Sequence, residues 1–581
     1  MDKRIRRLQC SLAPHYKKMK KLVNISCLTT IILLFPLSLP AQKSAATYFR
    51  NGLVVSAHPE ASRVGLEILK KGGNAIDAAV AVQFALAVVY PNAGNIGGGG
   101  FLVYRSSKGE VAALDYREKA PAGASRNMYL DPSGEPIKEK SLYGHLAAGV
   151  PGSVDGMIKA HSRFGKLKWA DLLEPAVKLA TKGFTLTSMQ ANELNGLKEK
   201  LIHFNPGGTA FVKASGDWKA GELLLQPELA RTLRHIQREG RKGFYEGEVA
   251  KAIAAEMNRG QGLITPADLK NYDSKWRQPV IGRYKDLKVI TMPPPSSGGI
   301  ALMQLLTSVE PYPLSRWGHN QDSTIRLITE AERRVYADRA KHLGDPDYYQ
   351  VPQRQLLDAE YQKQRMSSMD WTHATASSSV QAGVFKTHES EETTHFSIVD
   401  KDGNAVSVTT TLNGSYGSLV VVKGAGFLLN NEMDDFSVKP GSPNMYGLVG
   451  GEANAIAPGK RMLSSMTPTI LERKGKLFMV VGTPGGSTII TSVLQTILNV
   501  VEFGQNMQDA VASKRFHHQW LPDEIFIEDG AFDTGTIQKL SQKGYKVTAR
   551  GTIGRVDAIL ATPEGYQGGA DPRGDDTAAG Y

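Results

Sequence analysis

Thr393-Thr394-His395-Phe396-Ser397-Ile398-Val399-Asp400 leads through Lys401-Asp402-Gly403-Asn404 into Ala405-Val406-Ser407-Val408-Thr409-Thr410-Thr411-Leu412-Asn413. Both runs alternate apolar with small polar residues on either side of an Asp-Gly-Asn turn, which predicts a β-hairpin. If residues 401–403 form the loop, Asp400 pairs with Asn404. The same register then places Thr411 opposite Thr393, so that one hydroxyl group lies across the ladder from another.

The position of Thr393 gives this hairpin a chemical interpretation. The preceding segment, His388-Glu389-Ser390-Glu391-Glu392, is polar and acidic, and is predicted to be an exposed loop. Cleavage after Glu392 would make Thr393 a new N-terminus, whose α-amine can serve as the base for its own hydroxyl. The alternative is an ordinary hairpin whose threonines are chosen for their β-propensity.

Further segments place the hairpin in a family context. The hairpin and these segments, in chain order, resemble signatures of the γ-glutamyltransferase (γ-glutamyl transpeptidase) family, which belongs to the N-terminal-nucleophile hydrolases. The segments are Asn95-Ile96-Gly97-Gly98-Gly99-Gly100-Phe101, Asp115-Tyr116-Arg117-Glu118, Pro294-Pro295-Ser296-Ser297-Gly298-Gly299, Tyr336-Ala337-Asp338-Arg339, Asn430-Asn431-Glu432-Met433-Asp434-Asp435-Phe436, Leu463-Ser464-Ser465-Met466-Thr467-Pro468-Thr469 and Gly482-Thr483-Pro484-Gly485-Gly486-Ser487. The resemblance runs from about residue 50 to Tyr581.

The resemblance implies a fold and a maturation step. The fold is of the α/β (α+β) class: a four-layer αββα N-terminal-nucleophile hydrolase sandwich formed by both processed subunits. The chain is expected to cut itself between Glu392 and Thr393. The products are a large subunit of 351 residues (42–392) and a small catalytic subunit of 189 residues (393–581). The two are expected to stay together as a heterodimer and to form one globular unit.

The resemblance also assigns roles to single residues. Thr393 is the nucleophile, Thr411 orients it, and the N–H groups of Gly485 and Gly486 stabilise the oxyanion. The substrate-binding residues are Arg117, Ser464 and Ser465 for an α-carboxylate, Asn413, Glu432 and Asp435 for an α-ammonium, and Tyr446 in a Gly- and Pro-rich lid loop over residues 440–451. Family members carry either Gln or Glu at the position of Glu432, so this residue is expected to tune the affinity for the amine.

Elementary chemistry is compatible with these assignments. The planar guanidinium of Arg117, at the end of a predicted strand (111–117), suits a carboxylate because it can donate two parallel hydrogen bonds. Gly485 and Gly486 precede a predicted helix over 488–501, where backbone N–H groups point along the positive end of the dipole. Glu432 and Asp435 follow a predicted strand over 427–429. A metal site or a glycosidase pair is disfavoured there, because no histidine cluster or calcium loop accompanies the two acids.

The first 41 residues form a separate segment with the layout of a secretory signal peptide. Residues 2–21 hold eight Lys or Arg and one Asp, an apolar run follows over 22–39, and Pro36 interrupts it. A membrane anchor needs about 20 unbroken apolar residues. Met1 and Met19 are alternative starts. The product is expected to be exported, periplasmic or secreted, with no stable membrane anchor.

Removal of this segment changes the charge and the cysteine content of the chain. Of the formal net charge of +12, the first 41 residues carry +7, so that residues 42–581 carry +5, which indicates no nucleic-acid partner. Both cysteines, Cys10 and Cys27, lie in the leader. The mature chain therefore excludes disulfides, thiol catalysis and cysteine metal sites.

The N-terminal part of the mature chain predicts two helices and a tight glycine turn. Pro59 and the Gly72-Gly73 pair bracket an amphipathic helix, and residues 74–89 read as an Ala-rich buried helix. The four glycines 97–100 precede a predicted strand (101–104) and lack the Lys-Ser/Thr of a phosphate loop. Close backbone packing or a tight turn is the expected role.

The function implied by the resemblance is cleavage of the γ-glutamyl amide of glutathione and related compounds through a γ-glutamyl-Thr393 ester. Water then releases glutamate, or an amino acid or peptide amine accepts the group, and no metal or organic cofactor is required. A cephalosporin acylase or a poly-γ-glutamate enzyme is the alternative; it would keep Thr393 but need not keep Arg117 and Asp435 together. A serine hydrolase lacks its Gly-x-Ser-x-Gly elbow, and a non-enzymatic solute-binding protein gives no reason for the processing threonine.

Overall fold

Two antiparallel sheets form the centre of the molecule. A computed structural model describes residues 47–382, 393–439 and 451–581, and the described residues belong to one compact unit. The hairpin sheet has the order β19 (Thr577–Gly580), β2 (Leu53–Ser56), β10 (Thr394–Val399), β11 (Ala405–Thr411), β3 (Gly99–Arg105), β4 (Val111–Asp115) and β7 (Lys275–Arg277). The second sheet has the order β1 (Tyr48–Phe49), β18 (Gly565–Gly569), β17 (Asp557–Thr562), β13 (Lys476–Gly482), β12 (Thr469–Arg473), β9 (Leu287–Thr291) and β8 (Val280–Tyr284).

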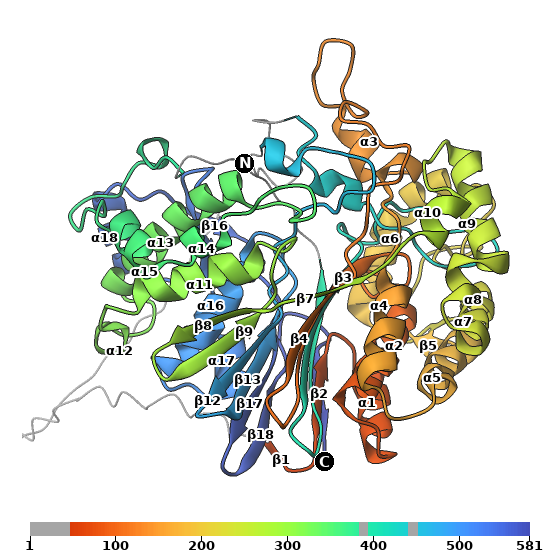
Figure 1. The fold of residues 1–581 in the computed structure, drawn as a ribbon, viewed down its shortest axis with the longest axis horizontal. Helices are drawn as coiled ribbons and strands as arrows, with labels where there is room; N and C mark the ends of the chain where they lie inside the picture. Colours follow the sequence, from red (N-terminus) through yellow and green to blue (C-terminus); the bar gives the residue numbers. More distant parts are fainter. Residues whose placement is uncertain (1–46, 383–392, 440–450) are drawn as a thin grey trace, which may run out of the picture. The chain divides into compact units, whose positions relative to one another are not determined.

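The two sheets pack face to face, and each is covered by helices on its outer side (Figure 1). Contacts of β10 and β11 with β13 and β17 join the sheets. The helices on the side of the hairpin sheet are α1 (Pro59–Lys70), α2 (Ala75–Val89), α4 (Ser153–Phe164), α5 (Trp169–Lys182) and α7 (Pro227–Glu239). Those on the side of the second sheet are α11 (Gly298–Val309), α13 (Asp322–His342), α16 (Thr488–Val501) and α17 (Met507–Ala512). The predicted αββα layering is confirmed.

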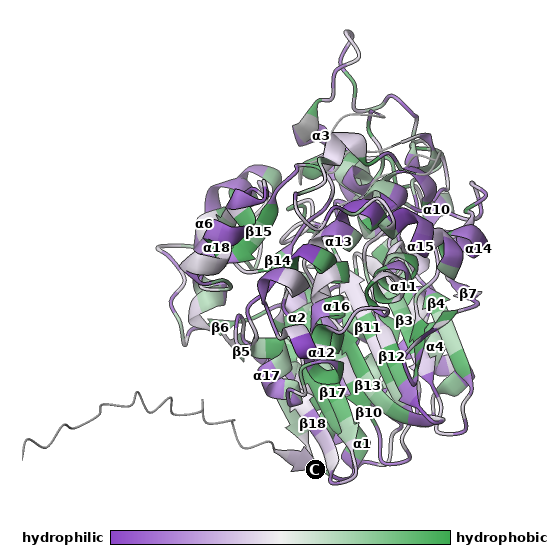
Figure 2. Cartoon of the chain, turned by 90° about the vertical axis from the view of Figure 1, so that its left-hand side faces the viewer, coloured by the Kyte–Doolittle hydropathy of each residue, from purple (hydrophilic) through white to green (hydrophobic). Residues whose placement is uncertain are grey.

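The hairpin strands are buried on both faces, and each face has a different chemistry. Phe396 and Ile398 point into the core shared with α1 and α2. Their neighbours His395 and Ser397 point between the two sheets, where Ser397 Oγ donates to the backbone oxygen of Asp557 at 3.0 Å. The strands of both sheets are mostly hydrophobic along their length (Figure 2). The small polar residues of the hairpin therefore form part of the interface between the sheets rather than a solvated face.

The predicted helices next to the hairpin sheet form as expected. In α1, Val64, Ile68 and Leu69 are buried. Asn74 caps α2 by accepting a hydrogen bond from the backbone N–H of Asp77, and every residue of α2 is buried. A helix that is apolar all round is stable only between other layers. This one packs against α1 and α5 as well as against β10 and β11.

Shorter elements surround this frame. The remaining α-helices are α3 (Lys138–Leu142), α6 (Ser188–Phe204), α8 (Lys242–Tyr245), α9 (Gly247–Gly260), α10 (Pro266–Lys270), α12 (Leu314–Trp317), α14 (Gln353–Leu356), α15 (Ala359–Met366) and α18 (Thr534–Gln542). The 3₁₀ turns are η1 (His145–Ala147), η2 (Ser377–Ser379), η3 (Glu432–Asp435) and η4 (Glu452–Asn454). Two small sheets consist of β5 (Phe184–Thr185) with β6 (Leu223–Leu224), and β14 (Phe516–His517) with β15 (Ile525–Glu528) and β16 (Val547–Arg550).

Two sequence predictions differ from the structure. Residues 427–429 were predicted as a strand, but only Leu428 forms a bridge, with Val421. The chain folds back there through Gly424 and Gly426, which have φ angles of 80° and 76°, and the N–H of Val422 donates to the oxygen of Phe427 at 2.9 Å. The strand that leads to Arg117 ends at Asp115, so Arg117 lies two residues beyond β4. No helix among the described residues has both the length and the apolar composition to cross a membrane.

Candidate active site

Thr393 lies immediately before β10, and its side chain is buried with 5% of the residue exposed. The pairs from Thr394 with Thr410 to Val399 with Ala405 have the predicted register. Asp400 also pairs with Asn404 as expected, through the bond from its N–H to the backbone oxygen at 3.1 Å. Continued by one residue, this register would place Thr393 opposite Thr411, the last residue of β11. The predicted hairpin is confirmed.

His395 lies two residues after Thr393 on the same face of β10, and its ring is fixed on both sides. Nδ1 is 2.9 Å from Thr409 Oγ1, and Nε2 is 3.0 Å from Ser397 Oγ. Burial lowers the pKa of His395 to about 3, so the imidazole is neutral. Gly482 is opposite, where a Cβ atom would lie 2.3 Å from the ring. With both nitrogens engaged, this histidine is a poorly placed proton acceptor.

The two glycines before α16 adopt conformations that favour glycine. Gly485 has a φ of 128° and Gly486 a φ of 56°. A Cβ atom on Gly485 would lie 2.5 Å from Thr488 Oγ1. The carbonyl oxygens of both glycines accept the first N–H groups of the helix, from Thr488 and Ile489, at 3.0 Å. Their own N–H groups bond to no other described residue, so both donors remain available to an oxyanion at the positive end of α16.

Arg117 is the centre of a buried group of charged side chains. Its Nη1 lies 2.7 Å from Glu432 Oε2 and 3.7 Å from Glu118 Oε2, and its Nη2 bonds to Asp435 Oδ2. Burial raises the pKa of Glu118 and of Glu432 to about 8, and raises that of Asp435 well above its usual range. The three acids outnumber the single guanidinium, so a second cation in the site would find acidic partners.

The segment with the two serines lies directly beside Arg117. Nη2 of Arg117 donates to the backbone oxygen of Leu463 at 2.9 Å. Ser464 Oγ accepts the backbone N–H of Met466 at 3.2 Å, and Ser465 Oγ accepts a hydrogen bond from Arg339 Nη2 at 3.1 Å. The structure thus brings Arg117, Ser464 and Ser465 to one place, although 345 residues separate Arg117 from Met462, whose backbone oxygen it also contacts.

Asn413 connects the end of the hairpin to the acidic turn η3. Its backbone N–H donates to Thr411 Oγ1 at 2.7 Å, and its side-chain Nδ2 donates to the backbone oxygen of Asn431 at 2.9 Å. The φ of Asn413 is 71°, a left-handed conformation that asparagine tolerates. Thr411, Asn413 and the turn that carries Glu432 are therefore held in one hydrogen-bonded unit.

The glycine run 97–100 allows backbone segments to approach this unit closely. Cβ atoms on Gly97 and Gly98 would lie 2.1 Å and 2.0 Å from the backbone oxygens of Leu428 and Thr411. The amide of Asn430 joins the run to η3, because Nδ2 donates to the oxygen of Gly97 at 2.8 Å and Oδ1 accepts the N–H of Glu432 at 3.0 Å. The predicted close packing is confirmed.

Comparison with known proteins identifies the family. The sequence model of the gamma-glutamyltranspeptidase family matches residues 61–581. The chain belongs to this family. It is 48% identical to a glutathione hydrolase proenzyme of Pseudomonas aeruginosa, over 92% of this chain and 95% of that protein. It is 45% identical to the glutathione hydrolase proenzyme of Escherichia coli, over 92% of each chain. A solved cephalosporin acylase from Bacillus halodurans superposes with a TM-score of 0.81 at 26% identity, over 95% of this chain and 99% of that one.

Two family motifs carry part of the resemblance but have no function assigned from the sequence, and the structure shows their contacts. In the motif 336–339, the Tyr336 hydroxyl donates to the backbone oxygen of Ser487, and Arg339 donates to Ser465. In the motif 294–299, the N–H and the hydroxyl of Ser297 both donate to the backbone oxygen of Ser464, at 2.7 and 2.8 Å. A buried arginine next to a tyrosine in a polar helix was the available signal. Its partner Ser297 is 42 residues away in sequence, and its partner Ser465 is 126 residues away.

Glu392, Tyr446 and nearly all of the lid loop lie outside the described residues, as does the leader 1–41. Among the described residues, no group of three or more His, Cys, Asp and Glu side chains is arranged to hold a metal ion.

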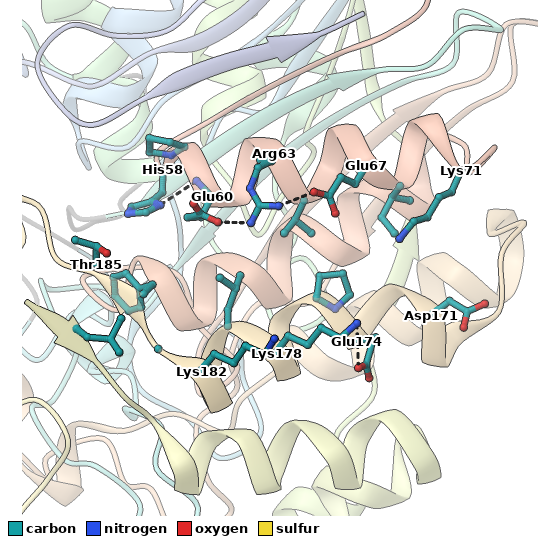
Figure 3. Close-up of a pocket in the computed structure, with 18 of the residues that line it drawn as sticks. His58, Glu60, Arg63, Glu67, Lys71, Asp171, Glu174, Lys178, Lys182 and Thr185 are labelled. Atoms are coloured by element: carbon teal, nitrogen blue, oxygen red, sulfur yellow. Dashed lines mark hydrogen bonds and ion pairs between the residues drawn. The ribbon is translucent and has the colours of Figure 1, made fainter. Parts of the chain in front are cut away.

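A separate cavity of about 830 Å³ lies between α1 and α5 (Figure 3). Its rim carries charges of both signs, and Arg63 there pairs with Glu60 and Glu67 along α1. None of the residues assigned to the γ-glutamyl site lines this cavity. It is therefore distinct from the candidate active site of the family.

Proposed function

We propose that this chain is a precursor that cuts itself between Glu392 and Thr393 and then acts as a γ-glutamyltransferase and glutathione hydrolase. Residues 1–41 would direct export to the periplasm or the medium. Residues 42–392 would form the large subunit, and residues 393–581 the small catalytic subunit. The observation that carries the proposal is the buried group of one guanidinium and three carboxyl groups around Arg117, in the same unit as the hairpin of Thr393.

Maturation and turnover use the same hydroxyl group. In the precursor, Thr393 Oγ attacks the carbonyl carbon of Glu392, the acyl group moves from nitrogen to oxygen, and water hydrolyses the ester. The freed α-amine has an ordinary pKa of about 7.7–8.0, which suits a general base near neutral pH. It takes the hydroxyl proton as Thr393 Oγ attacks the γ-carbonyl of the substrate. The N–H groups of Gly485 and Gly486 stabilise the oxyanion, and the leaving amine takes the proton.

The γ-glutamyl ester is then resolved by a second acyl transfer. Water, deprotonated by the same α-amine, releases glutamate and restores the hydroxyl of Thr393. An amino acid or peptide amine in place of water gives a new γ-glutamyl amide. Thr411 Oγ1, held by the N–H of Asn413, supports the orientation of Thr393 across the hairpin.

Substrate binding exchanges the partners of Arg117 and of the acidic side chains beside it. The α-carboxylate replaces the carboxyl groups on Arg117 and takes hydrogen bonds from Ser464 and Ser465. The α-ammonium replaces the guanidinium at Asp435 and Glu432, assisted by Asn413. Each charge of the substrate then has a buried partner of opposite sign, which matters because an unpaired buried charge costs several kcal/mol. A substrate with only one of the two charges would leave one side of the site without a partner.

A cephalosporin acylase activity is the second candidate, because such an enzyme superposes over nearly the whole chain. The excess of acids around Arg117 favours a substrate with an ammonium group and therefore a γ-glutamyl head group. The test is the release of a chromogenic amine from γ-glutamyl anilide and from glutaryl anilide, which lacks the ammonium. A preference for the γ-glutamyl compound supports the proposal, and equal use of both compounds contradicts it.

The proposed base predicts a pH profile. The value of kcat/KM for γ-glutamyl anilide should rise with pH through the pKa of the Thr393 α-amine, because only the neutral amine accepts the hydroxyl proton. Selective acylation of this amine in processed enzyme should abolish turnover and leave both subunits assembled, as measured by activity and by size-exclusion chromatography. Full activity after blocking verified by mass spectrometry would exclude the amine as the base.

The raised pKa of Glu432 predicts proton release when an ammonium ligand binds. Near neutral pH the Glu432 carboxyl retains its proton in most molecules, since burial raises its pKa to about 8. An ammonium binds the ionised form better, so the Kd for glutamate should fall as pH rises toward 8, by at most about tenfold per pH unit for one proton. In Glu432→Gln this dependence should weaken, leaving the contribution of Glu118 and Asp435. Calorimetric titration in two buffers counts the released protons, and equal release by both proteins would contradict the prediction.

A further inference from the structure

Arg339 is a buried arginine that contacts the serine segment of the site without belonging to it. It lies in the last turn of α13, and 1% of its surface is exposed. Its Nε donates to Ser297 Oγ at 3.0 Å, and its Nη2 donates to Ser465 Oγ at 3.1 Å. Its guanidinium carbon lies 5.8 Å from the ring centre of Tyr336.

We propose that Arg339 is a positioning residue that orients Ser465, and through Ser297 also Ser464, as hydrogen-bond donors to the substrate's α-carboxylate. This inference rests on the proposed γ-glutamyl site. An arginine has five N–H donors and no acceptor. Ser465 Oγ must therefore accept from Arg339, and its single hydroxyl hydrogen points elsewhere. A carboxylate accepts and never donates, so a serine whose hydrogen points away from Arg339 has the polarity that a carboxylate needs.

The second branch reaches Ser464 through its backbone. Ser297 Oγ accepts from Arg339 and donates its own hydrogen to the backbone oxygen of Ser464 at 2.8 Å. The guanidinium sets the direction of these two hydrogen bonds. If the Ser297 hydroxyl were reversed, its hydrogen would meet the hydrogen of Arg339 Nε. Ser464 Oγ accepts the N–H of Met466 at 3.2 Å, so its hydrogen also points away from the segment that holds it.

Tyr336 provides a matched contrast one turn earlier on α13. Its hydroxyl donates to the backbone oxygen of Ser487, the residue that follows the two glycines. Tyr336 therefore supports the oxyanion side of the site, while Arg339 supports the carboxylate side. Both are on one face of one helix, three residues apart. Loss of either should affect the enzyme in a different, measurable way.

The test compares three anilides: γ-glutamyl anilide, glutaryl anilide without the ammonium, and 4-aminobutyryl anilide without the carboxylate. In Arg339→Gln we expect kcat/KM to fall about 10- to 100-fold for the two compounds with a carboxylate, mainly through KM, and to change little for the third. Arg339→Lys, which keeps a donor and a charge, should recover part of the loss. Tyr336→Phe should lower kcat for all three compounds alike.

A double-mutant cycle tests the proposed route. If Arg339 acts through Ser465, Arg339→Gln should cost much less in a Ser465→Ala background than in the wild type. Equal losses of Arg339→Gln for all three anilides, or full additivity with Ser465→Ala, would overturn the inference. If Arg339→Gln does not fold or process, Ser297→Ala, which keeps the arginine, replaces it in the test. It must lower kcat/KM selectively for the two compounds with a carboxylate, by a smaller factor. An equal loss for all three compounds refutes the proposal.

The wild-type enzyme separates this inference from the function on which it rests. A wild type that uses 4-aminobutyryl anilide as well as γ-glutamyl anilide overturns the proposed function, and the role of Arg339 with it. If the wild type requires the carboxylate and Arg339→Gln requires it equally, only the role of Arg339 is overturned.

Discussion

Thr393→Ala should remain a single uncut chain with no measurable release of amine from γ-glutamyl anilide. The substitution removes the hydroxyl that attacks both the Glu392 carbonyl and the substrate. Loss of the nucleophile in a hydrolase lowers kcat by a factor on the order of 10⁶. Denaturing gels and intact mass spectrometry report the cleavage, and the fragment of the wild-type chain should begin Thr-Thr-His-Phe.

The neighbouring threonine offers a control for this experiment. Thr394 occupies the next position in β10, its side chain is equally buried, and its hydroxyl has no hydrogen-bond partner among the described residues. Thr394→Ala should therefore still be cut and still be active. Thr393→Ser, which keeps a hydroxyl, should also be cut. If Thr393→Ala splits at the same bond as the wild type, an external protease performs the cleavage, and the proposed maturation is wrong.

Arg117→Lys and Asp435→Asn should each lower kcat/KM for γ-glutamyl anilide by about 30-fold to 4,000-fold. This range corresponds to the roughly 2–5 kcal/mol lost when one partner of a buried charged contact is removed. Lysine keeps the charge of Arg117 but cannot form two parallel hydrogen bonds to a carboxylate. Asparagine at position 435 removes the carboxylate that would hold the ammonium. Steady-state kinetics on processed enzyme, verified by its two subunit bands, gives the measurement.

An exposed arginine provides the matched comparison for Arg117→Lys. Arg63 pairs with Glu60 and Glu67 on the surface of α1 (Figure 3), and its side chain is 52% exposed. Exposed pairs of this kind contribute at most about 1 kcal/mol to stability, and Arg63 does not touch the candidate site. Arg63→Lys should therefore match the wild type. Near-normal kcat/KM in both Arg117→Lys and Asp435→Asn would mean that the enzyme accepts a different acyl group.

Features that depend on neighbouring residues were predictable from the sequence. The hairpin register follows from the turn at 401–403, and Asp400 closes this turn by accepting the N–H groups of Asp402 and Asn404 at 3.0 and 2.9 Å. The cap at Asn74 and the glycines before Thr488 likewise mark the starts of α2 and α16. The predicted strand over 427–429 was wrong. The chain turns back on itself there, and only Leu428 forms a bridge, with Val421, although the segment is apolar.

The sequence pattern was less informative about the surroundings of the hairpin. Alternating polar and apolar residues usually indicate a strand with one solvated face. In this protein both faces are buried, and His395, Ser397, Ser407 and Thr409 lie between two sheets. There Ser407 Oγ donates to the backbone oxygen of Val481 at 3.2 Å. The second sheet that covers them comes from segments before and after the hairpin, so the sequence of the hairpin alone does not predict it.

The sequence by itself determined the hairpin, the capped helices, the glycine turn before α16 and, through its motifs, the family and the identity of the candidate site residues. Only the tertiary structure decided how those residues meet. It pairs Arg117 with Asp435 across 318 residues, fixes both nitrogens of His395, and sets Arg339 behind Ser465. The physical reason is the distance in sequence between the residues that interact. Turns and caps are set by hydrogen bonds within a few residues. Buried charges and hydroxyls take their pKa and their direction from partners that only the packing of two sheets and their helices brings into contact.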